Sequence, residues 1–371
     1  MRALVMRSLA ALAVLAMTTA GGRAAELDEA VYRRLNEALA TGYVVPRYEA
    51  LAKATAALDA GARAFCDQPG RTPLVELRRR YADASDAWQR IQHVRFGPVE
   101  YFSRSARIAF WPDPRNSVGR ALEELLAKAD PAALEPDAFG RGNVAAQGFP
   151  ALERLMFADG AETLLLAGDD GAKRRCLVLR SVTGNLARMA ADVHHEWVGG
   201  DRPFLKVMAA AGAADSPYQH PREATLDFVK ALHLSVELVS DHKLARPLGS
   251  AIQAARPRLA EAWRSGRSLE NIRLDLAAGA ALYEGKDGFS AVVRGPAGDA
   301  ALDDLLRRAF AQVRATAEAI RPPLESAVED AKRRPAAERL VRETAALKAL
   351  IAQRLTEALG IPLGFNALDG D

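Results

Sequence analysis

The stretch CLVLRSVTGNLARMAADVHHEW, residues 176–197, decides the fold class of this sequence. Its apolar residues recur at alternating spacings of three and four, which is the pattern of one buried helix face: Leu179, Val182, Leu186, Met189, Val193 and Trp197. The same spacing recurs over residues 48–65, 74–91, 225–242 and 306–320. Long helices with one apolar stripe pack together as antiparallel bundles. We therefore predict an all-α protein with two four-helix-bundle-like halves of antiparallel, up-down helices.

Glycine- and proline-rich segments separate these helices. A non-periodic loop rich in proline and arginine interrupts the first half between Phe96 and Gly142. The segment Gly199-Gly200-Asp201-Arg202-Pro203 precedes a second group of helices, so we place the domain boundary there. The predicted units are an N-terminal helical bundle with the Pro/Arg-rich loop, residues 25–198, and a C-terminal helical bundle, residues 199–371.

The composition is that of a globular protein, since 49% of the 371 residues are hydrophobic and 26% are charged. The formal net charge of +3 comes from Arg2, Arg7 and Arg23, and without them 47 basic residues face 47 acidic ones. No cluster of lysine and arginine alternates with aromatic residues. We therefore predict that nucleic acid is not a partner.

Residues 1–24 have the parts of a secretory signal peptide: a basic start, an apolar stretch from Ser8 to Ala20, and small residues before a cleavage after Ala24. An uncleaved membrane anchor is the alternative, but the apolar stretch is shorter than the roughly 20 residues that a spanning helix needs. No later apolar run reaches that length. The sequence predicts export to the periplasm without a stable membrane span.

Export changes the interpretation of the two cysteines, Cys66 and Cys176. In an oxidising compartment they are expected to form a disulfide, for which they are the one available pair. The alternative is a pair of buried, inert thiols. A catalytic cysteine is disfavoured because no histidine accompanies either residue in the sequence.

The common enzyme motifs are absent: HExxH, a glycine-rich phosphate loop, GxSxG and a zinc-spaced Cys/His cluster. The triplet His194-His195-Glu196 resembles a metal site, but adjacent helix residues point about 100° apart, so both imidazoles cannot face one ion. His93 ends a helix beside the irregular loop, where it is either a site residue or a structural histidine.

Five segments together resemble the imelysin family. They are WQRIQHVRFGP at 88–98, RIAFWPDPRN at 107–116, QGFPALERL at 147–155, DHKLARPLG at 241–249 and YEGKDGF at 283–289. The resemblance covers nearly the whole chain after residue 24. It implies an exported, all-helical protein with two bundle-like halves in a family that is often iron-regulated and in which some members are described as peptidases.

The hallmark of that family is GxHxxE, and this sequence has GxPxxE at Gly148, Pro150 and Glu153. Proline has no side-chain donor or ligand atom, so it cannot form the His/Glu pair that would hold a metal or act as a base. The resemblance therefore implies the fold and the compartment rather than peptidase activity. It leaves the cofactor unknown, with iron or another metal as the candidates.

We expect a polar pocket around Glu153 in the first half. Arg95, Arg107 and Arg115 would face the carboxylates of Asp113 and Glu153, so that one guanidinium lacks a partner and can bind an anion. The predicted ligand-binding residues are Gln89, His93, Arg95, Arg107, Trp111, Asp113, Arg115 and Glu153. The alternative is a buried ion network that only fixes the loop.

The sequence therefore predicts a non-catalytic, imelysin-like exported protein connected with iron or metal uptake. Its partner would be a small anionic ligand, a metal chelate or a protein of an uptake system. A metallopeptidase is the first alternative, and it would have to use His93 and Glu153 as ligands. A helical scaffold or interaction module that uses exposed helix faces is the second.

Overall fold

The computed structural model describes residues 27–127 and 130–361, and these residues form helices without any strand. The predicted signal peptide lies outside them. The prediction of an all-α fold is confirmed. The helices of the first half are α1 (Glu29–Leu39), α2 (Val45–Asp67), α3 (Arg71–Gln89), α4 (Arg104–Ile108), α5 (Ser117–Ala127), α6 (Pro136–Arg141), α7 (Gly148–Phe157), α8 (Ala161–Leu166) and α9 (Asp170–Val198).

The second half contains α10 (Phe204–Ala209), α11 (Pro221–Glu237), α12 (Ala245–Leu248), α13 (Ser268–Glu284), α14 (Phe289–Arg294), α15 (Ala300–Ala319), α16 (Leu324–Glu329), α17 (Arg334–Leu350) and α18 (Thr356–Ala358). Short 3₁₀ turns are η2 (Gly97–Ser103), η3 (Ala132–Leu134), η4 (Val144–Ala146), η6 (Ile252–Ala254) and η7 (Pro257–Leu259). Three π-helical turns, η1 (Ala40–Val44), η5 (Leu238–Leu244) and η8 (Ile351–Leu355), interrupt longer helical runs.

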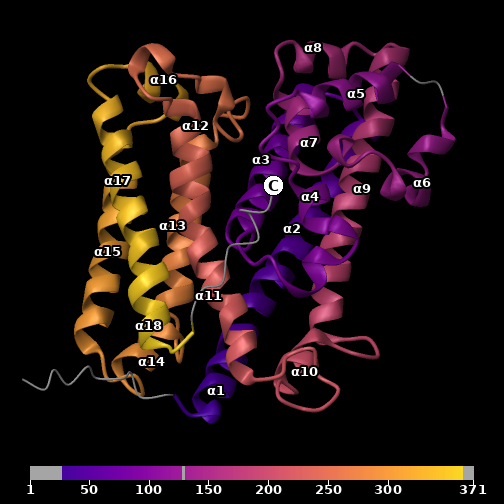
Figure 1. Cartoon of the computed structure of the whole chain (residues 1–371). Helices are drawn as coiled ribbons and strands as arrows, with labels where there is room; N and C mark the ends of the chain where they lie inside the picture. The colour runs from indigo at the N-terminus through magenta and orange to yellow at the C-terminus, as the bar shows by residue number, and fades with distance from the viewer. Residues whose placement is uncertain (1–26, 128–129, 362–371) are drawn as a thin grey trace, which may run out of the picture.

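The two halves lie side by side and differ in regularity (Figure 1). In the second half, α11, α13, α15 and α17 each pack on the next, and α17 returns to α11, which closes an up-down four-helix bundle. In the first half the long helix α2 packs against both α3 and α9, and the short helices α5 to α8 pack along α9. These short helices, which lie within the Pro/Arg-rich loop and directly after it, thus take the place of a fourth long helix.

Helix α1 connects the two halves. It continues through η1 into α2, yet it packs against α11 of the second half. The Asn36 amide donates to the Pro221 carbonyl at 2.8 Å, and the Tyr32 hydroxyl donates to the Leu359 carbonyl at 2.7 Å. The division of the chain at residue 199 stays a prediction, and α1 crosses it.

The apolar stripes of the sequence form the core. The buried residues of α2 are the six of its predicted stripe, from Tyr48 to Phe65, and all six stripe residues of α9 are buried. Cys66 at the end of α2 and Cys176 near the start of α9 form a disulfide, with their Cα atoms 5.5 Å apart. The predicted pairing is confirmed, and it ties together two of the three long helices of the first half.

One stripe departs from its expected spacing. The pattern of residues 225–242 predicts that His242 shares the buried face, but His242 is half-buried and Lys243 is buried instead. Residues Leu238–Leu244 form the π-helical turn η5, which contains one residue more per turn than an α-helix. The extra residue rotates the following side chains, and this brings the Lys243 ammonium into the interior.

Candidate functional site

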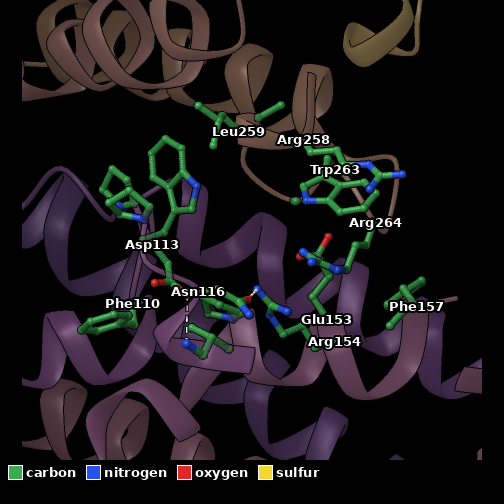
Figure 2. Close-up of a pocket in the computed structure, with 18 of the residues that line it drawn as sticks. Phe110, Asp113, Asn116, Glu153, Arg154, Phe157, Arg258, Leu259, Trp263 and Arg264 are labelled. Atoms are coloured by element: carbon green, nitrogen blue, oxygen red, sulfur yellow. Dashed lines mark hydrogen bonds between the residues drawn. The ribbon is translucent and has the colours of Figure 1, made fainter. Parts of the chain in front are cut away.

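A cleft of about 610 Å³ opens between the two halves. One wall consists of the loop before α5 and of helix α7, and the other consists of Arg246 and residues 258–264 (Figure 2). In this view Arg258, Trp263 and Arg264 face Asp113, Glu153 and Arg154. The second half therefore supplies a large part of a site that the sequence predicted within the first half.

Helix α7 begins at Gly148, the first residue of the GxPxxE segment. Gly148 has a φ of +68°, and a Cβ atom there would lie 2.1 Å from the Ile108 carbonyl oxygen. Any side chain would collide with the main chain of the loop, so the position requires glycine. This close approach fixes α7 against the segment that leads to Trp111.

Glu153 connects α7 with the second half. One oxygen of its carboxylate accepts hydrogen bonds from the Ser265 amide at 2.9 Å and from the Ser265 hydroxyl at 3.0 Å. Burial raises the pKa of Glu153, and these hydrogen bonds partly oppose the rise. Glu153 therefore joins the two cleft walls.

Asp113 stabilises the start of α5. Its two carboxylate oxygens accept hydrogen bonds from the amides of Ser117 at 2.7 Å and Val118 at 2.9 Å. Both oxygens thus satisfy main-chain donors at the N-terminus of a helix. The Asp113 charge is committed to the fold, although the residue lines the cleft.

Four arginines line the cleft, namely Arg154, Arg246, Arg258 and Arg264. None of them forms an ion pair with a carboxylate in the part of the chain that the structure describes. Arg154 donates to the Asn116 side-chain oxygen, and the Arg264 guanidinium lies 4.3 Å from the centre of the Trp263 ring. Burial and the nearby charge of Arg154 lower the pKa of Arg264. The carboxylates of Glu153 and Asp159 partly oppose this lowering. The cleft therefore holds guanidinium groups that repel one another and that its own carboxylates compensate only in part.

Deeper between the halves lies a second group of charges, centred on Lys243. Its ammonium lies 2.8 Å from a Glu261 carboxylate oxygen and 2.5 Å from oxygens of Asp275 and Gln89. Burial raises the pKa of Asp275 to about 7, and the neighbouring Lys243 charge opposes that rise. We call Lys243, Glu261, Asp275 and Gln89 the Lys243 cluster. It joins α3 of the first half to η5 and α13 of the second.

The structure distributes the predicted site residues over several places. Trp111, Asp113 and Glu153 line the cleft, together with Pro150, and Gln89 belongs to the Lys243 cluster. His93 is buried, and its Nε2 lies 2.8 Å from the Tyr43 hydroxyl. Burial and the charges of nearby arginines lower the pKa of His93 to about 3, so the imidazole is neutral.

The expected convergence of Arg95, Arg107 and Arg115 on Glu153 is wrong. Arg95 donates to the Gln92 carbonyl at 2.8 Å, and Arg107 donates to the carbonyls of Phe102 at 3.0 Å and Gly140 at 2.7 Å. Arg115 is exposed. Main-chain carbonyls of the irregular first half therefore hold Arg95 and Arg107 away from the cleft.

The arginines that do line the cleft carried a weaker signal in the sequence. Arg246 lies in the segment DHKLARPLG, and Arg154 directly follows the GxPxxE segment. Arg258, Trp263 and Arg264 lie in ARPRLAEAWRSGR, residues 255–267, where arginines surround a tryptophan outside any helical stripe. In the sequence, the wall formed by residues 258–264 is indicated only by an arginine-rich stretch without helical periodicity.

The cleft residues do not fit a zinc-holding His/Glu pair. Pro150 offers no ligand atom, and Glu153 is bonded to Ser265. Within residues 27–127 and 130–361, no group of three or more His, Cys, Asp or Glu is placed to hold a metal ion. In the triplet at 194–196, Glu196 pairs with Arg104, with a nitrogen-to-oxygen distance of 2.6 Å.

No helix in the described part of the chain combines the length and the apolar character that a membrane crossing requires. Among curated proteins, no match to this chain was found.

The family model of imelysin, peptidase family M75, matches residues 44–353. The chain is also similar to the crystal structure of an imelysin-like protein from Psychrobacter arcticum, with a TM-score of 0.74 and 22% identity over 92% of this chain and 99% of that one. A second similar structure is that of an iron-regulated protein A precursor from Parabacteroides distasonis, with a TM-score of 0.75 and 15% identity over 90% of this chain and 96% of that one. These structures share the fold, and the match of the family model shows that the chain belongs to the imelysin family.

Proposed function

We propose that this protein is a non-catalytic binding protein whose cleft takes a small anionic ligand or a metal chelate. The observation that carries the proposal is the set of four arginines without a carboxylate partner in the described structure. Three carboxylates line the cleft. Asp113 caps a helix, Glu153 is bonded to Ser265, and Asp159 attracts Arg264 without forming an ion pair with it. An anion would relieve the repulsion among the guanidinium groups.

The chemistry of the walls suits carboxylates. A guanidinium offers parallel N–H donors that match the two oxygens of a carboxylate, and it is more weakly hydrated than an ammonium group. Trp111, in the loop before α5, and Trp263, in the wall from the second half, add flat apolar surfaces to the cleft. A compact polycarboxylate, free or with a bound metal ion, fits this combination in charge and in size.

The setting we propose is the periplasm, in connection with iron or metal uptake. The signal-peptide pattern of residues 1–24 and the Cys66–Cys176 disulfide support export. The name of the Parabacteroides distasonis neighbour, an iron-regulated protein A precursor, supports the link to iron. Zinc-dependent peptidase activity is not part of this proposal, because Pro150 stands where the family hallmark has histidine.

A contact with a protein of the uptake system is a second candidate function. Tyr101 and Phe102 are adjacent aromatic residues at the surface, and the Phe102 side chain is 79% exposed. Phe102 and Ser103 both have left-handed backbones, which L-residues seldom adopt. Phe102→Ser is expected to abolish copurification of such a partner from the native host while leaving anion binding unchanged.

Calorimetry and thermal unfolding with citrate and ferric citrate test the cleft. We expect the melting temperature to rise with ligand concentration, because a ligand that binds the folded state stabilises it by RT ln(1+[L]/Kd). Arg264→Gln should weaken binding about tenfold, the loss of one charge-assisted pair. The control is Arg141→Gln, which changes an exposed arginine on α6, outside the cleft residues. No effect of either compound, or equal affinities for the wild type and Arg264→Gln, would contradict the proposal.

A further inference from the structure

A small chamber adjoins the inner end of the cleft. Its volume is about 40 Å³, and it shares four wall residues with the cleft: Trp111, Pro150, Glu153 and Ala262. A water molecule occupies about 30 Å³ in the liquid, so the chamber has room for one water or for one group of similar size. It is therefore an extension of the cleft rather than a separate binding site.

Two residues that line the chamber each have a buried polar atom without a hydrogen-bond partner among the described residues. These atoms are the indole Nε1 of Trp88, which is a donor, and the side-chain Oδ1 of Asn271, which is an acceptor. Both residues are 1% exposed. Other polar groups of the chamber are engaged, since Glu153 bonds to Ser265 and Glu261 accepts from the Asn271 amide at 2.8 Å. Buried polar groups are nearly always matched by water or a ligand.

The two unpaired atoms define the kind of group that would satisfy both. The Trp88 indole needs an acceptor, and the Asn271 oxygen needs a donor. A hydroxyl group supplies both functions and is about as large as water. A carboxylate does not fit, because it cannot donate to Asn271 and because the carboxylates of Glu153 and Glu261 also line the chamber.

We propose that this chamber is the inner subsite of the cleft and that it takes a hydroxyl group of the bound anion, which makes hydroxycarboxylates the ligand class. The inference rests on the proposed function, since the arginines of the cleft would hold the carboxylates of the same molecule. In the absence of such a ligand, a water molecule in the chamber would serve as the partner of Trp88 and Asn271. The ligand hydroxyl replaces that water without leaving either group unpaired.

The test compares citrate with tricarballylate, which is citrate without the hydroxyl group. Calorimetry should show that the wild type binds citrate about tenfold more tightly than tricarballylate. Trp88→Phe removes the indole donor, and Ala109→Val fills the chamber, which Ala109 also lines. In both variants the advantage of citrate should disappear, while the affinity for tricarballylate stays within about twofold of the wild type.

A spectroscopic measurement reports on the chamber directly. The chain has four tryptophans, and the loss of one indole N–H resonance in Trp88→Phe assigns that of Trp88. Citrate should shift this resonance in the wild type, and tricarballylate should leave it in place. Equal affinities for the two acids, or a citrate advantage that persists in both variants, would overturn the chamber proposal and leave the cleft proposal standing. Failure of the wild type to bind either acid would overturn the proposed function itself.

Discussion

Two groups of charged residues lie between the halves of this protein, and they are built differently. In the Lys243 cluster a buried ammonium contacts three side-chain oxygens at 2.5 to 2.8 Å. In the cleft, four arginines line about 610 Å³ of open space without a carboxylate partner in the described structure. The charges of the Lys243 cluster are paired with one another, whereas the cleft arginines remain available to a ligand. Pairing and access, rather than the presence of charge, separate a structural cluster from a binding site.

The contrast is sharpest within one short segment. Lys243 and Arg246 are three residues apart, yet Lys243 is 1% exposed and belongs to the cluster, whereas Arg246 lines the cleft. The π-helical turn η5 ends at Leu244, so it rotates Lys243 into the interior just before α12 begins. Removing either cation changes the charge of the segment equally. The two variants should nevertheless differ in their unfolding free energy and in their affinity for anions.

The largest effect is expected for Lys243→Met. This change removes the ammonium and leaves the carboxylates of Glu261 and Asp275 buried without their cation. Breaking a buried ion pair on one side costs about 3–5 kcal/mol of unfolding free energy. Urea unfolding followed by circular dichroism measures the loss. Lys243→Met combined with Asp275→Asn should recover part of it, because one uncompensated carboxylate is then neutral; a single variant as stable as the wild type would contradict the structural role.

A pH dependence follows from Asp275, whose pKa of about 7 lies above its unfolded value because of burial. Between about pH 4 and pH 7 the folded state holds a proton at Asp275 that the unfolded state has released, so the stability contributed by this group falls as pH rises. The fall should be on the order of 2–4 kcal/mol. Asp275→Asn cannot titrate, so its unfolding free energy relative to the wild type should increase over this range. A difference that is constant with pH would place the Asp275 pKa near its ordinary value.

The regular parts of the fold could be predicted from the sequence. Apolar residues at spacings of three and four form one helix face, and this face is buried whichever helix packs against it. The stripe from Tyr48 to Phe65 therefore matches the buried residues of α2. The pairing of Cys66 with Cys176 needed no geometry, because the chain has two cysteines. The π-helical turn at Leu238–Leu244 could not be predicted in this way. A periodic pattern assumes a constant number of residues per turn, so it cannot detect one inserted residue.

The candidate site could be predicted only in part. Trp111, Asp113 and Glu153 lie in distinctive segments of the sequence, and all three line the cleft. The places of the arginines do not follow from a count of side-chain charges, because main-chain carbonyls bind Arg95 and Arg107. Arg258 and Arg264 reach the cleft through the packing of one half against the other. Contacts of this kind leave no periodic pattern in a single sequence.

A smaller effect on stability is expected for Arg246→Gln. Arg246 forms no ion pair in the described residues, although it lines the cleft. Its removal should change the unfolding free energy by less than about 0.5 kcal/mol, as for most changes away from packed or paired groups. Citrate binding should nevertheless weaken severalfold. Burial and, after it, the charge of Arg246 lower the pKa of His242, so an NMR titration should show that this pKa rises in the variant. A loss of stability comparable to that of Lys243→Met would remove the distinction between the two charge groups.

The smallest effect is expected on proteolysis, because Glu153→Gln should leave the rate of protein cleavage unchanged. Glutamine keeps an oxygen that can accept from Ser265, so the link between the cleft walls persists, while the negative charge facing the arginines is lost. Above the raised pKa of Glu153, anion affinity should therefore increase a fewfold. Because Pro150 cannot ligate a metal, we expect no chelator-sensitive cleavage of casein by homogeneous wild-type protein, and none by the variant. Chelator-sensitive cleavage that Glu153→Gln abolishes would make Glu153 a catalytic group and the cleft an active site. If proteolysis is unchanged and citrate binds more tightly to the variant, the negative charge of Glu153 lowers the affinity of the cleft for anions.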